Sequence, residues 1–179
     1  MKILFITGNK NKLSEALEIM PQIEGCDVDL PEIQEIDTKK IIEHKLLEAI
    51  KQKPNTALIV EDQSLTIDGL NGLPGPLIKW FLMSLENKGL YKMAKSMGNC
   101  NAQATTTIGY CNEIGEIYYF DATVSGKIVA PIGDHGWGWD PIFLPSGYNL
   151  TLGQMTADQK NELSSRRVVF DKLKKFLNL

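Results

Sequence analysis

The stretch ALIVED at residues 57–62 decides the fold class of this chain. Its first four residues form an uninterrupted apolar run that stops at Glu61 and Asp62. A short continuous run of this kind is typical of a central strand whose two faces are both covered. The run therefore predicts a buried strand that ends at Glu61. Two carboxylates at the end of such a strand indicate a functional site.

The residues that precede this stretch predict alternating strands and helices. Residues 2–7 are mostly apolar and form a first strand, and Asn9 then caps a helix with apolar side chains at helical spacing. Residues 26–30, CDVDL, alternate between polar and apolar side chains as a strand does. A second helix is expected over residues 38–52, with Lys45 outside its buried face.

The residues that follow the central strand predict more helix and an antiparallel pair. The Gly- and Pro-rich loop at 69–76 precedes two apolar helical patterns, at 77–85 and 90–97. Two strand-like runs follow, at 102–111 and 116–129, and a four-residue turn between them predicts a hairpin.

The C-terminal part adds a loop rich in glycine and tryptophan at 131–141 and a last helix over 161–177. Strand and helix units combined with a hairpin predict an α/β fold, with a mixed twisted sheet flanked by helices. We expect two lobes around a central cleft. They would belong to a single domain over residues 1–179, because the sequence contains neither repeats nor a linker.

Composition and charge exclude several classes of protein. The chain has 19 Lys and Arg against 22 Asp and Glu, a formal net charge of -3 and a pI near 5.5, unlike a duplex nucleic-acid binder. Its three cysteines follow neither disulfide nor zinc spacing and favour a reducing compartment. No apolar segment reaches the roughly 18 residues of a membrane span. We expect a cytoplasmic protein without nucleic-acid or membrane partners.

The turn TGNKNK at 7–12 is the first candidate binding site. It lies between a strand and a helix N-terminus, where backbone N–H groups, Thr7, Asn9 and the two lysines could hold an anion. The alternative is an ordinary capped turn with solvated lysines, and the residues alone leave both open. P-loop, dinucleotide-binding, HExxH and GxSxG motifs are absent from the sequence, which leaves phosphate and carboxylate chemistry.

Two acidic side chains are candidate metal ligands. Glu32 belongs to the acidic segment 31–37, and Asp62 follows the apolar run. Mg²⁺ takes oxygen ligands from one or two carboxylates and binds phosphate oxygens as well. Asp62 could instead, or in addition, activate an attacking water as a general base. The alternative for both residues is a solvated surface carboxylate.

Aromatic and basic residues are candidate ligand contacts. Trp137 or Trp139 could stack on a purine while Asp140 accepts from ring N–H groups, although loop tryptophans also serve as packing lids. Lys79 is the only charge in an apolar stretch, so it either snorkels from a buried helix or faces an anion. Two basic residues at the start of the last helix are also well placed for a ligand: Lys160 and Arg166.

Seven motifs in this order resemble the inosine triphosphate pyrophosphatase family, which hydrolyses deaminated purine nucleoside triphosphates. The resemblance covers nearly the whole chain, and its fourth motif is closer to the eukaryotic than to the bacterial form. The motifs are TGNKNK (7–12), LPE (30–32), IVED (59–62), GLPGPLIKWF (72–81), GKIVAP (126–131), GWDP (138–141) and KNxxSxR (160–166).

The resemblance implies a nucleotide-binding cleft and a role for each matching residue. Glu32 and Asp62 would bind Mg²⁺, or Mn²⁺ in its place, and the catalytic residues would be Asp62, Glu61 and Lys12, with either carboxylate activating water. We expect Arg166 to donate to the purine O6. The full set expected to bind the substrate is Thr7, Gly8, Asn9, Lys10, Asn11, Lys12, His44, Asp62, Gln63, Lys79, Trp137, Gly138, Trp139, Asp140, Lys160, Ser164, Ser165 and Arg166.

The chain departs from the family pattern at three places. The family's closing Ser-His-Arg reads SSR at 164–166, which predicts altered base discrimination. The family's lysine on the second helix falls on His44, with Lys45 beside it, so either residue could fill this position. Trp137 stands where the family usually has Phe and still offers a stacking ring.

We therefore expect Mg²⁺-dependent hydrolysis of ITP, dITP and XTP to the monophosphate and pyrophosphate, by attack of water on the α-phosphorus. The resemblance also implies a homodimer. Two alternatives stay open. One is a pyrophosphatase with a broad or pyrimidine-leaning base preference, which the replacement at Ser165 favours. The other is a nucleotide sensor that does not turn its ligand over.

Overall fold

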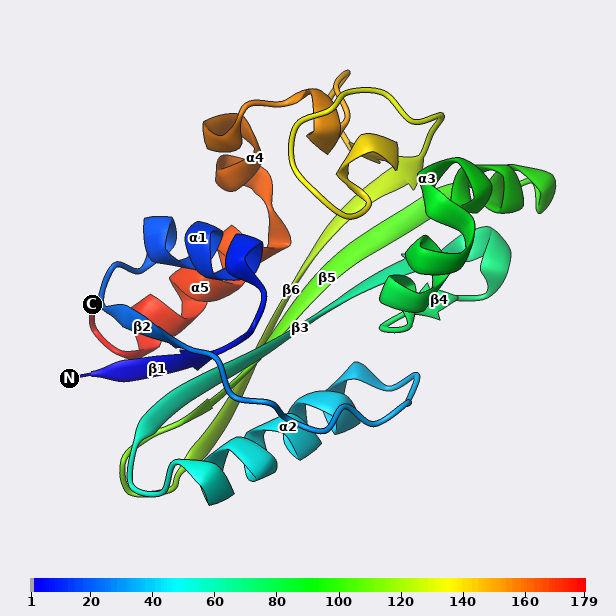
Figure 1. The fold of residues 1–179 in the computed structure, drawn as a ribbon. Coiled ribbons are helices and arrows are strands. Elements are labelled where there is room, and N and C mark those ends of the chain that lie inside the picture. The colour runs from blue at the N-terminus through cyan, green and yellow to red at the C-terminus, as the bar shows by residue number, and fades with distance from the viewer. Residues whose placement is uncertain (1) are drawn as a thin grey trace. The chain divides into compact units, whose positions relative to one another are not determined.

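Within residues 2–179, which the computed structural model describes, seven strands form one mixed sheet (Figure 1). The strand order is β2-β1-β3-β5-β6-β7, and β4 pairs with β3. The β1 strand pairs in parallel with β2 and β3, whereas β3–β4 and β6–β7 are antiparallel. The expected α/β class with a mixed sheet is confirmed. The strands are β1 (Ile3–Ile6), β2 (Ile23–Cys26), β3 (Ala57–Ile67), β4 (Pro74–Gly75), β5 (Asn101–Cys111), β6 (Ile117–Ile128) and β7 (Phe143–Pro145).

The helices agree with the sequence periodicity more closely at the start of the chain than at its end. Asn9 caps the first helix, and its side chain accepts from the backbone of Asn11 and Lys12. The second helix has the expected bounds. The expected last helix is two helices, because Ser164 has an extended backbone between them. The helices are α1 (Lys10–Ile19), α2 (Thr38–Gln52), α3 (Ile78–Ser96), α4 (Ala157–Leu163) and α5 (Ser165–Phe176).

Two strand expectations were wrong. The strand expected at 26–30 lies earlier, at β2, where it pairs with β1. The central strand β3 does not end at Glu61 but continues to Ile67, so the two carboxylates lie inside the strand. An apolar run marks the part of a strand that is covered on both faces, and the strand itself can continue beyond that cover.

The chain divides into two compact units. Unit 1 comprises residues up to 62, 106–122 and 166–179, and unit 2 comprises 63–105 and 123–165. The unit boundaries fall within the long strands β3, β5 and β6, and after the first residue of α5. Two units fit the expected two lobes, whereas the nucleotide-binding cleft and the single domain stay predictions.

Unit 1 explains the uninterrupted apolar run. Ala57 and Ile59 pack in a cluster with residues of α1 and α5, whereas Leu58 and Val60 pack in another with residues of α2. Figure 1 shows α2 on the opposite side of these strands from α1 and α5. Because side chains alternate between the two faces of a strand, a strand that is covered on both faces must be apolar throughout.

Unit 2 has its own hydrophobic cluster. Residues of β3, β5, β6 and β7 pack there against α3 and against two short 3-10 helices, Asp140–Ile142 and Leu152–Gln154. The α3 helix is interrupted at Glu86, where φ is 55° and ψ is 178°. This break explains why the sequence shows two helical patterns rather than one. Over the described part of the chain, the helices are too short or too polar to cross a bilayer.

Candidate functional site

The turn between β1 and α1 is held by its own side chains. The Thr7 hydroxyl accepts from the Asn9 backbone N–H at 3.1 Å. The Asn9 side chain accepts from two backbone N–H groups in the first turn of α1. Gly8, Asn9 and Lys10 are exposed, and Lys12 is half-buried. A capped turn followed by a helix N-terminus orients backbone N–H groups and positive charge in the same region, as an anion site requires.

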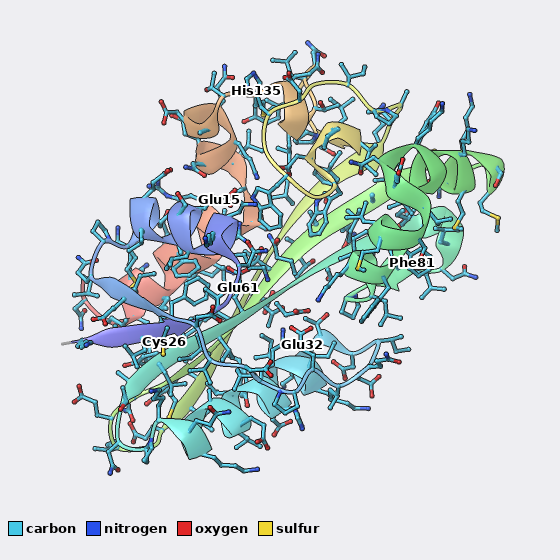
Figure 2. All side chains as sticks on the ribbon, viewed as in Figure 1. Glu15, Cys26, Glu32, Glu61, Phe81 and His135 are labelled. Atoms are coloured by element: carbon cyan, nitrogen blue, oxygen red, sulfur yellow. The ribbon has the colours of Figure 1, made fainter. Side chains whose placement is uncertain are left out.

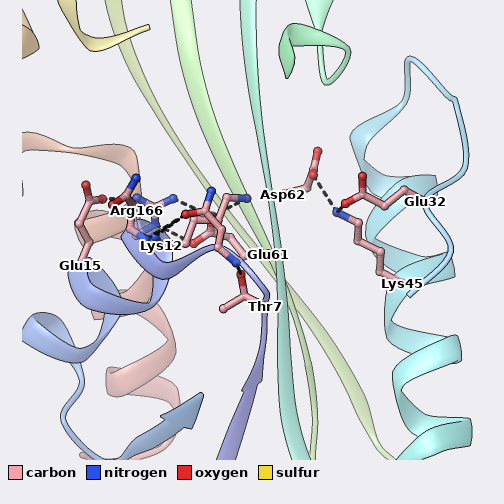
Figure 3. Close-up of polar contacts among 10 residues, drawn as sticks. Thr7, Lys12, Glu15, Glu32, Lys45, Glu61, Asp62 and Arg166 are labelled. Carbon is pink, nitrogen blue, oxygen red and sulfur yellow. Dashed lines mark hydrogen bonds and ion pairs between the residues drawn. The ribbon is translucent and has the colours of Figure 1, made fainter. Parts of the chain in front are cut away.

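Glu61 is the centre of a buried ion network in unit 1 (Figure 3). Arg166 of α5 binds it with two hydrogen bonds, Nε to Oε2 at 2.8 Å and Nη2 to Oε1 at 2.9 Å. The Lys12 ammonium lies 3.3 Å from Oε1, and Glu15 of α1 accepts from the same arginine. Figure 2 shows that Glu15 extends from the helix α1 and Glu61 from the sheet strand β3. The Glu61 side chain is completely buried.

The ion network keeps Glu61 ionised. Burial alone would raise the pKa of Glu61, but the charges and hydrogen bonds of Arg166 and Lys12 outweigh burial and hold it at about 2. The Arg166 pKa is raised by the same partners against its own burial. Glu61 is therefore a poor acceptor of a proton at neutral pH.

Asp62 belongs to a second ion network, on the α2 side of β3. The Lys45 ammonium lies 2.8 Å from Glu32 Oε1 and 3.1 Å from Asp62 Oδ1, so that it bridges the two carboxylates (Figure 3). Burial would lower the pKa of Lys45, but the two carboxylates outweigh burial and raise it. The other Asp62 oxygen, Oδ2, is buried and has no hydrogen-bond partner among residues 2–179.

The alternation of side chains along β3 separates these two networks. Glu61 and Asp62 are neighbours in one strand, so their side chains point to opposite faces. Glu61 meets α1 and α5, whereas Asp62 meets α2 and the segment that contains Glu32. One strand thus supplies a carboxylate paired with two cations on one face, Glu61, and on the other face a carboxylate with one oxygen that lacks a partner, Asp62.

The residues around Asp62 fit a divalent cation. A buried carboxylate oxygen without a partner is costly unless a donor or a cation binds it, and Asp62 Oδ2 is such an atom. Glu32, with 55% of its side chain exposed, could supply a second oxygen. In the described residues, groups of three or more acidic, His or Cys side chains suited to a metal are absent. A cation here would need further oxygens from water or phosphate, as Mg²⁺ usually does.

The loop at 136–140 in unit 2 is built around the buried carboxylate of Asp140. Its Oδ2 accepts from the Trp137 backbone N–H at 2.7 Å and from the Lys160 ammonium at 2.6 Å. Gly136 has a φ of 75°, and a Cβ there would lie 2.2 Å from the same oxygen, so only glycine fits. The Lys160 ammonium also lies 5.3 Å from the centre of the Trp137 ring.

The two tryptophans of this loop have different environments. Trp139 is 8% exposed and packs in the hydrophobic cluster of unit 2, as a packing residue. Trp137 keeps its ring partly exposed. Of the two rings considered for stacking, Trp137 is the one that a ligand can reach.

The structure brings some expected residues together and not others. Lys45, and not His44, meets the carboxylates, because buried positions on α2 include Ile41 and Lys45, which corrects the expected helix face. Lys79 is exposed at the start of α3, with its ammonium 5.5 Å from the Trp80 ring centre. Three further expected residues are at least half-buried: Gln63 and Ser164 are half-buried, and Ser165 is buried at the start of α5.

The placement of Arg166 differs from the sequence expectation. It was expected to donate to a purine, but it is 2% exposed and its guanidinium is engaged by Glu61 and Glu15. Carboxylates are its natural bidentate partners, and burial strengthens the preference. Sequence reasoning missed Glu15. Its signal is the spacing of three residues from Lys12 on one helix, which puts both side chains on the same face.

Known proteins resemble this chain over nearly its whole length. The model of the Ham1 family matches residues 3–176. The chain is 40% identical over 186 residues to the inosine triphosphate pyrophosphatase of the yeast Candida glabrata, covering 98% of this chain and 97% of that protein.

Two solved structures are similar over nearly their whole length. A HAM1 protein from Coxiella burnetii has a TM-score of 0.84 at 20% identity, over 99% of this chain and 98% of that one, and supports the fold alone. A nucleoside-triphosphatase described as a dITP/XTP pyrophosphatase from Mycobacterium abscessus has a TM-score of 0.72 at 25% identity, over 97% and 98%.

Proposed function

The chain belongs to the Ham1 family, and from this premise we propose that it is a nucleoside triphosphate pyrophosphatase acting on deaminated purines. Its substrates would be ITP, dITP and XTP, and its products the nucleoside monophosphate and pyrophosphate. The names of the yeast relative and of the mycobacterial structure support this substrate class. Loss of such nucleotides from the cellular pool would follow from the reaction.

The observation that carries the proposal is the state of Asp62. It is largely buried, beside the Lys45 ammonium, with one oxygen that lacks a partner. A carboxylate in this state can bind a cation and accept a proton from water. Glu61, its neighbour, is engaged by Arg166 and Lys12 and has a pKa of about 2, so we infer that Asp62 rather than Glu61 activates the water.

We assign the phosphate chemistry to unit 1. The Thr7–Lys12 turn would bind the phosphates through its lysines at the N-terminus of α1, and Lys45 would add a further positive charge. The oxygen of water attacks the α-phosphorus while the bond to the α,β-bridging oxygen breaks. Asp62 takes the proton of the attacking water, and pyrophosphate leaves.

Glu32 and Asp62 would hold Mg²⁺, or Mn²⁺ in its place. The bound ion would supply positive charge to the phosphate oxygens, which repel a nucleophile when they are not neutralised. The buried Asp62 Oδ2 and the exposed Glu32 carboxylate support this assignment. The family resemblance supports a homodimer, and the cysteine spacing, which favours a reducing compartment, supports a cytoplasmic location.

We assign base recognition to the loop at 136–140 in unit 2. The Trp137 ring would stack on the base, and base stacking on an aromatic side chain contributes about 1–3 kcal/mol per base. Asp140 pairs with the Lys160 ammonium and would accept from a ring N–H. Because Arg166 is engaged by Glu61, we transfer the discrimination against ATP from this arginine to the unit 2 loop.

A substrate panel tests the proposed function. Pyrophosphate release is measured from ITP, XTP, GTP, ATP and dTTP, each with Mg²⁺ and with EDTA. We expect release from ITP and XTP to exceed that from ATP by about 100-fold, because a buried polar group left unpaired costs about 1–3 kcal/mol. Equal turnover of all bases would favour the broad-specificity alternative. Binding without release would favour the nucleotide sensor.

Lys45 is expected to compete with a metal ion for the two carboxylates. Its ammonium bridges Glu32 and Asp62, so its positive charge opposes the binding of a cation to these carboxylates. We predict that Lys45→Met tightens Mn²⁺ binding to the substrate-free protein by about tenfold, or about 1.4 kcal/mol. Electron paramagnetic resonance of free Mn²⁺ measures this directly. Weaker or unchanged binding would show that the ammonium does not exclude the ion.

The matched control for this prediction is Lys40→Met. Lys40 is on the same helix and pairs with Glu35 at 3.3 Å, but 63% of its side chain is exposed. Removal of this positive charge changes the net charge of the protein equally. It should leave Mn²⁺ affinity within about twofold, because exposed charges at a distance are screened by solvent and salt.

A further inference from the structure

Asn87 lies where α3 is interrupted and reaches a loop 51 positions further along the chain. Its side-chain Nδ2 donates to the Gly138 carbonyl at 2.9 Å, and both residues belong to unit 2. The residue before it, Glu86, has the positive φ that breaks the helix. The interruption turns the chain so that Asn87 is half-buried, while Glu86 and Lys88 beside it are exposed.

The Gly138 carbonyl is a sensitive point in the loop. Gly138 has a φ of 64°, and an added Cβ there would meet nothing within 4 Å. The side of Gly138 on which a Cβ would project is therefore open. On one side of it the Trp137 N–H is fixed by Asp140, and on the other side Trp139 is buried in the core. The Asn87 hydrogen bond holds the peptide group between these two anchors.

The second polar atom of the Asn87 side chain has a different state. Its Oδ1 is buried and has no hydrogen-bond partner within residues 2–179. Burying an acceptor without a partner costs folding free energy, so an asparagine would be a poor choice here if the position served packing alone. The donor to Gly138 is the contact that explains its placement.

We propose that Asn87 is a positioning residue for base recognition, which fixes the Trp137 ring through the Gly138 carbonyl. This rests on the proposed function, in which Trp137 stacks on the base. With the Gly138 peptide held, the Trp137 side chain is ordered before a ligand arrives, and binding does not have to order it. When the donor is lost, the ring samples several orientations and the nucleotide binds more weakly. The groups that carry the phosphate chemistry belong to unit 1, whereas Asn87 and Gly138 belong to unit 2.

The test uses four variants of the full chain. Asn87→Asp has nearly the same shape but replaces the donor with an oxygen that repels the Gly138 carbonyl. Asn87→Ala truncates the side chain, and Asn87→Gln keeps the donor. Lys88→Ala is the matched control, because Lys88 is exposed on the same helix. We expect Asn87→Asp and Asn87→Ala to raise the KM for ITP about tenfold with kcat within twofold. Asn87→Gln should recover part of the loss, and Lys88→Ala should change neither value.

Acrylamide quenching of tryptophan fluorescence provides a readout without turnover. It is measured in a Trp80→Phe background, which leaves Trp137 as the partly exposed ring and Trp139 as the buried one. We expect Asn87→Asp to increase the quenching constant at least twofold and Lys88→Ala to leave it unchanged. This result supports the ordering of the loop even if ITP proves not to be a substrate, so failure of the proposed function is recognised separately.

Two outcomes would overturn the inference. The first is unchanged quenching together with an unchanged KM in Asn87→Asp. The second is a fall in kcat and in thermal stability as large as the change in KM, because this pattern would show that Asn87 supports the fold of unit 2 rather than the orientation of Trp137.

Discussion

Replacement of Asp62 by asparagine is expected to lower kcat by about 10²–10⁴-fold, the usual contribution of a general base. Asparagine keeps the shape of the side chain but can neither accept the proton of the attacking water nor contribute negative charge to a cation. The buried Oδ2 without a partner is the atom whose chemistry is lost. Pyrophosphate release from ITP under saturating Mg²⁺ measures the effect.

The control for this variant is Asp68→Asn. Asp68 is exposed and directly follows the C-terminal end of the strand that contains Asp62. It should retain full activity, while both variants give the same far-UV circular dichroism. Near-normal turnover in Asp62→Asn would show that this residue is not the general base. Glu61 could not easily replace it, because its pKa is lowered to about 2.

Replacement of Glu61 by glutamine is expected to cost about 3–5 kcal/mol of folding stability, because breaking a buried ion pair leaves its partner charge uncompensated. The partners are Arg166, which is 2% exposed, and Lys12. Urea denaturation followed by circular dichroism measures the difference. The neighbouring ion pair Arg167–Asp171 provides the control, because the Arg167 side chain is 41% exposed and the Asp171 side chain is 44% exposed. Asp171→Asn should cost less than about 1 kcal/mol.

The pH dependence of folding stability provides a second test of the Glu61 ion network. The Glu61 pKa is lowered from 4.5 to about 2 in the folded chain, so its contribution is complete above pH 4.5 and is lost as the pH falls toward 2. The difference in stability between the native chain and Glu61→Gln should therefore shrink over this interval. A difference that stays constant from pH 7 to pH 2 would contradict the buried ion network.

A double variant separates the pair from its surroundings. Arg166→Met alone leaves Glu61 and Glu15 without their shared cation and should also destabilise the fold. Combined with Glu61→Gln, it removes both buried charges. We expect the loss of folding free energy in the double variant to be smaller than the sum of the two single losses by about 0.5–3 kcal/mol, the range for residues in one network. Strict additivity would mean that the contact contributes no coupling.

The sequence determined the features that depend on neighbouring residues. The apolar run at 57–60, the Asn9 cap, the hairpin and the two halves of α3 follow from spacing, capping and turn chemistry, which act over a few positions. The same local patterns, taken in order, were specific enough to indicate the family. The observed bounds differ from the expected ones where an element continues beyond its apolar residues, as β3 does.

Only the tertiary structure decided which polar side chain does what. Alternation along a strand puts Glu61 and Asp62 on opposite faces, but the helices packed on each face decide which one is neutralised. Arg166 reaches Glu61 across 105 positions, and the Asn87 contact with Gly138 spans 51. Such partners leave no local spacing to detect. Their pairing, and with it the burial and pKa of each group, is fixed by how the elements pack.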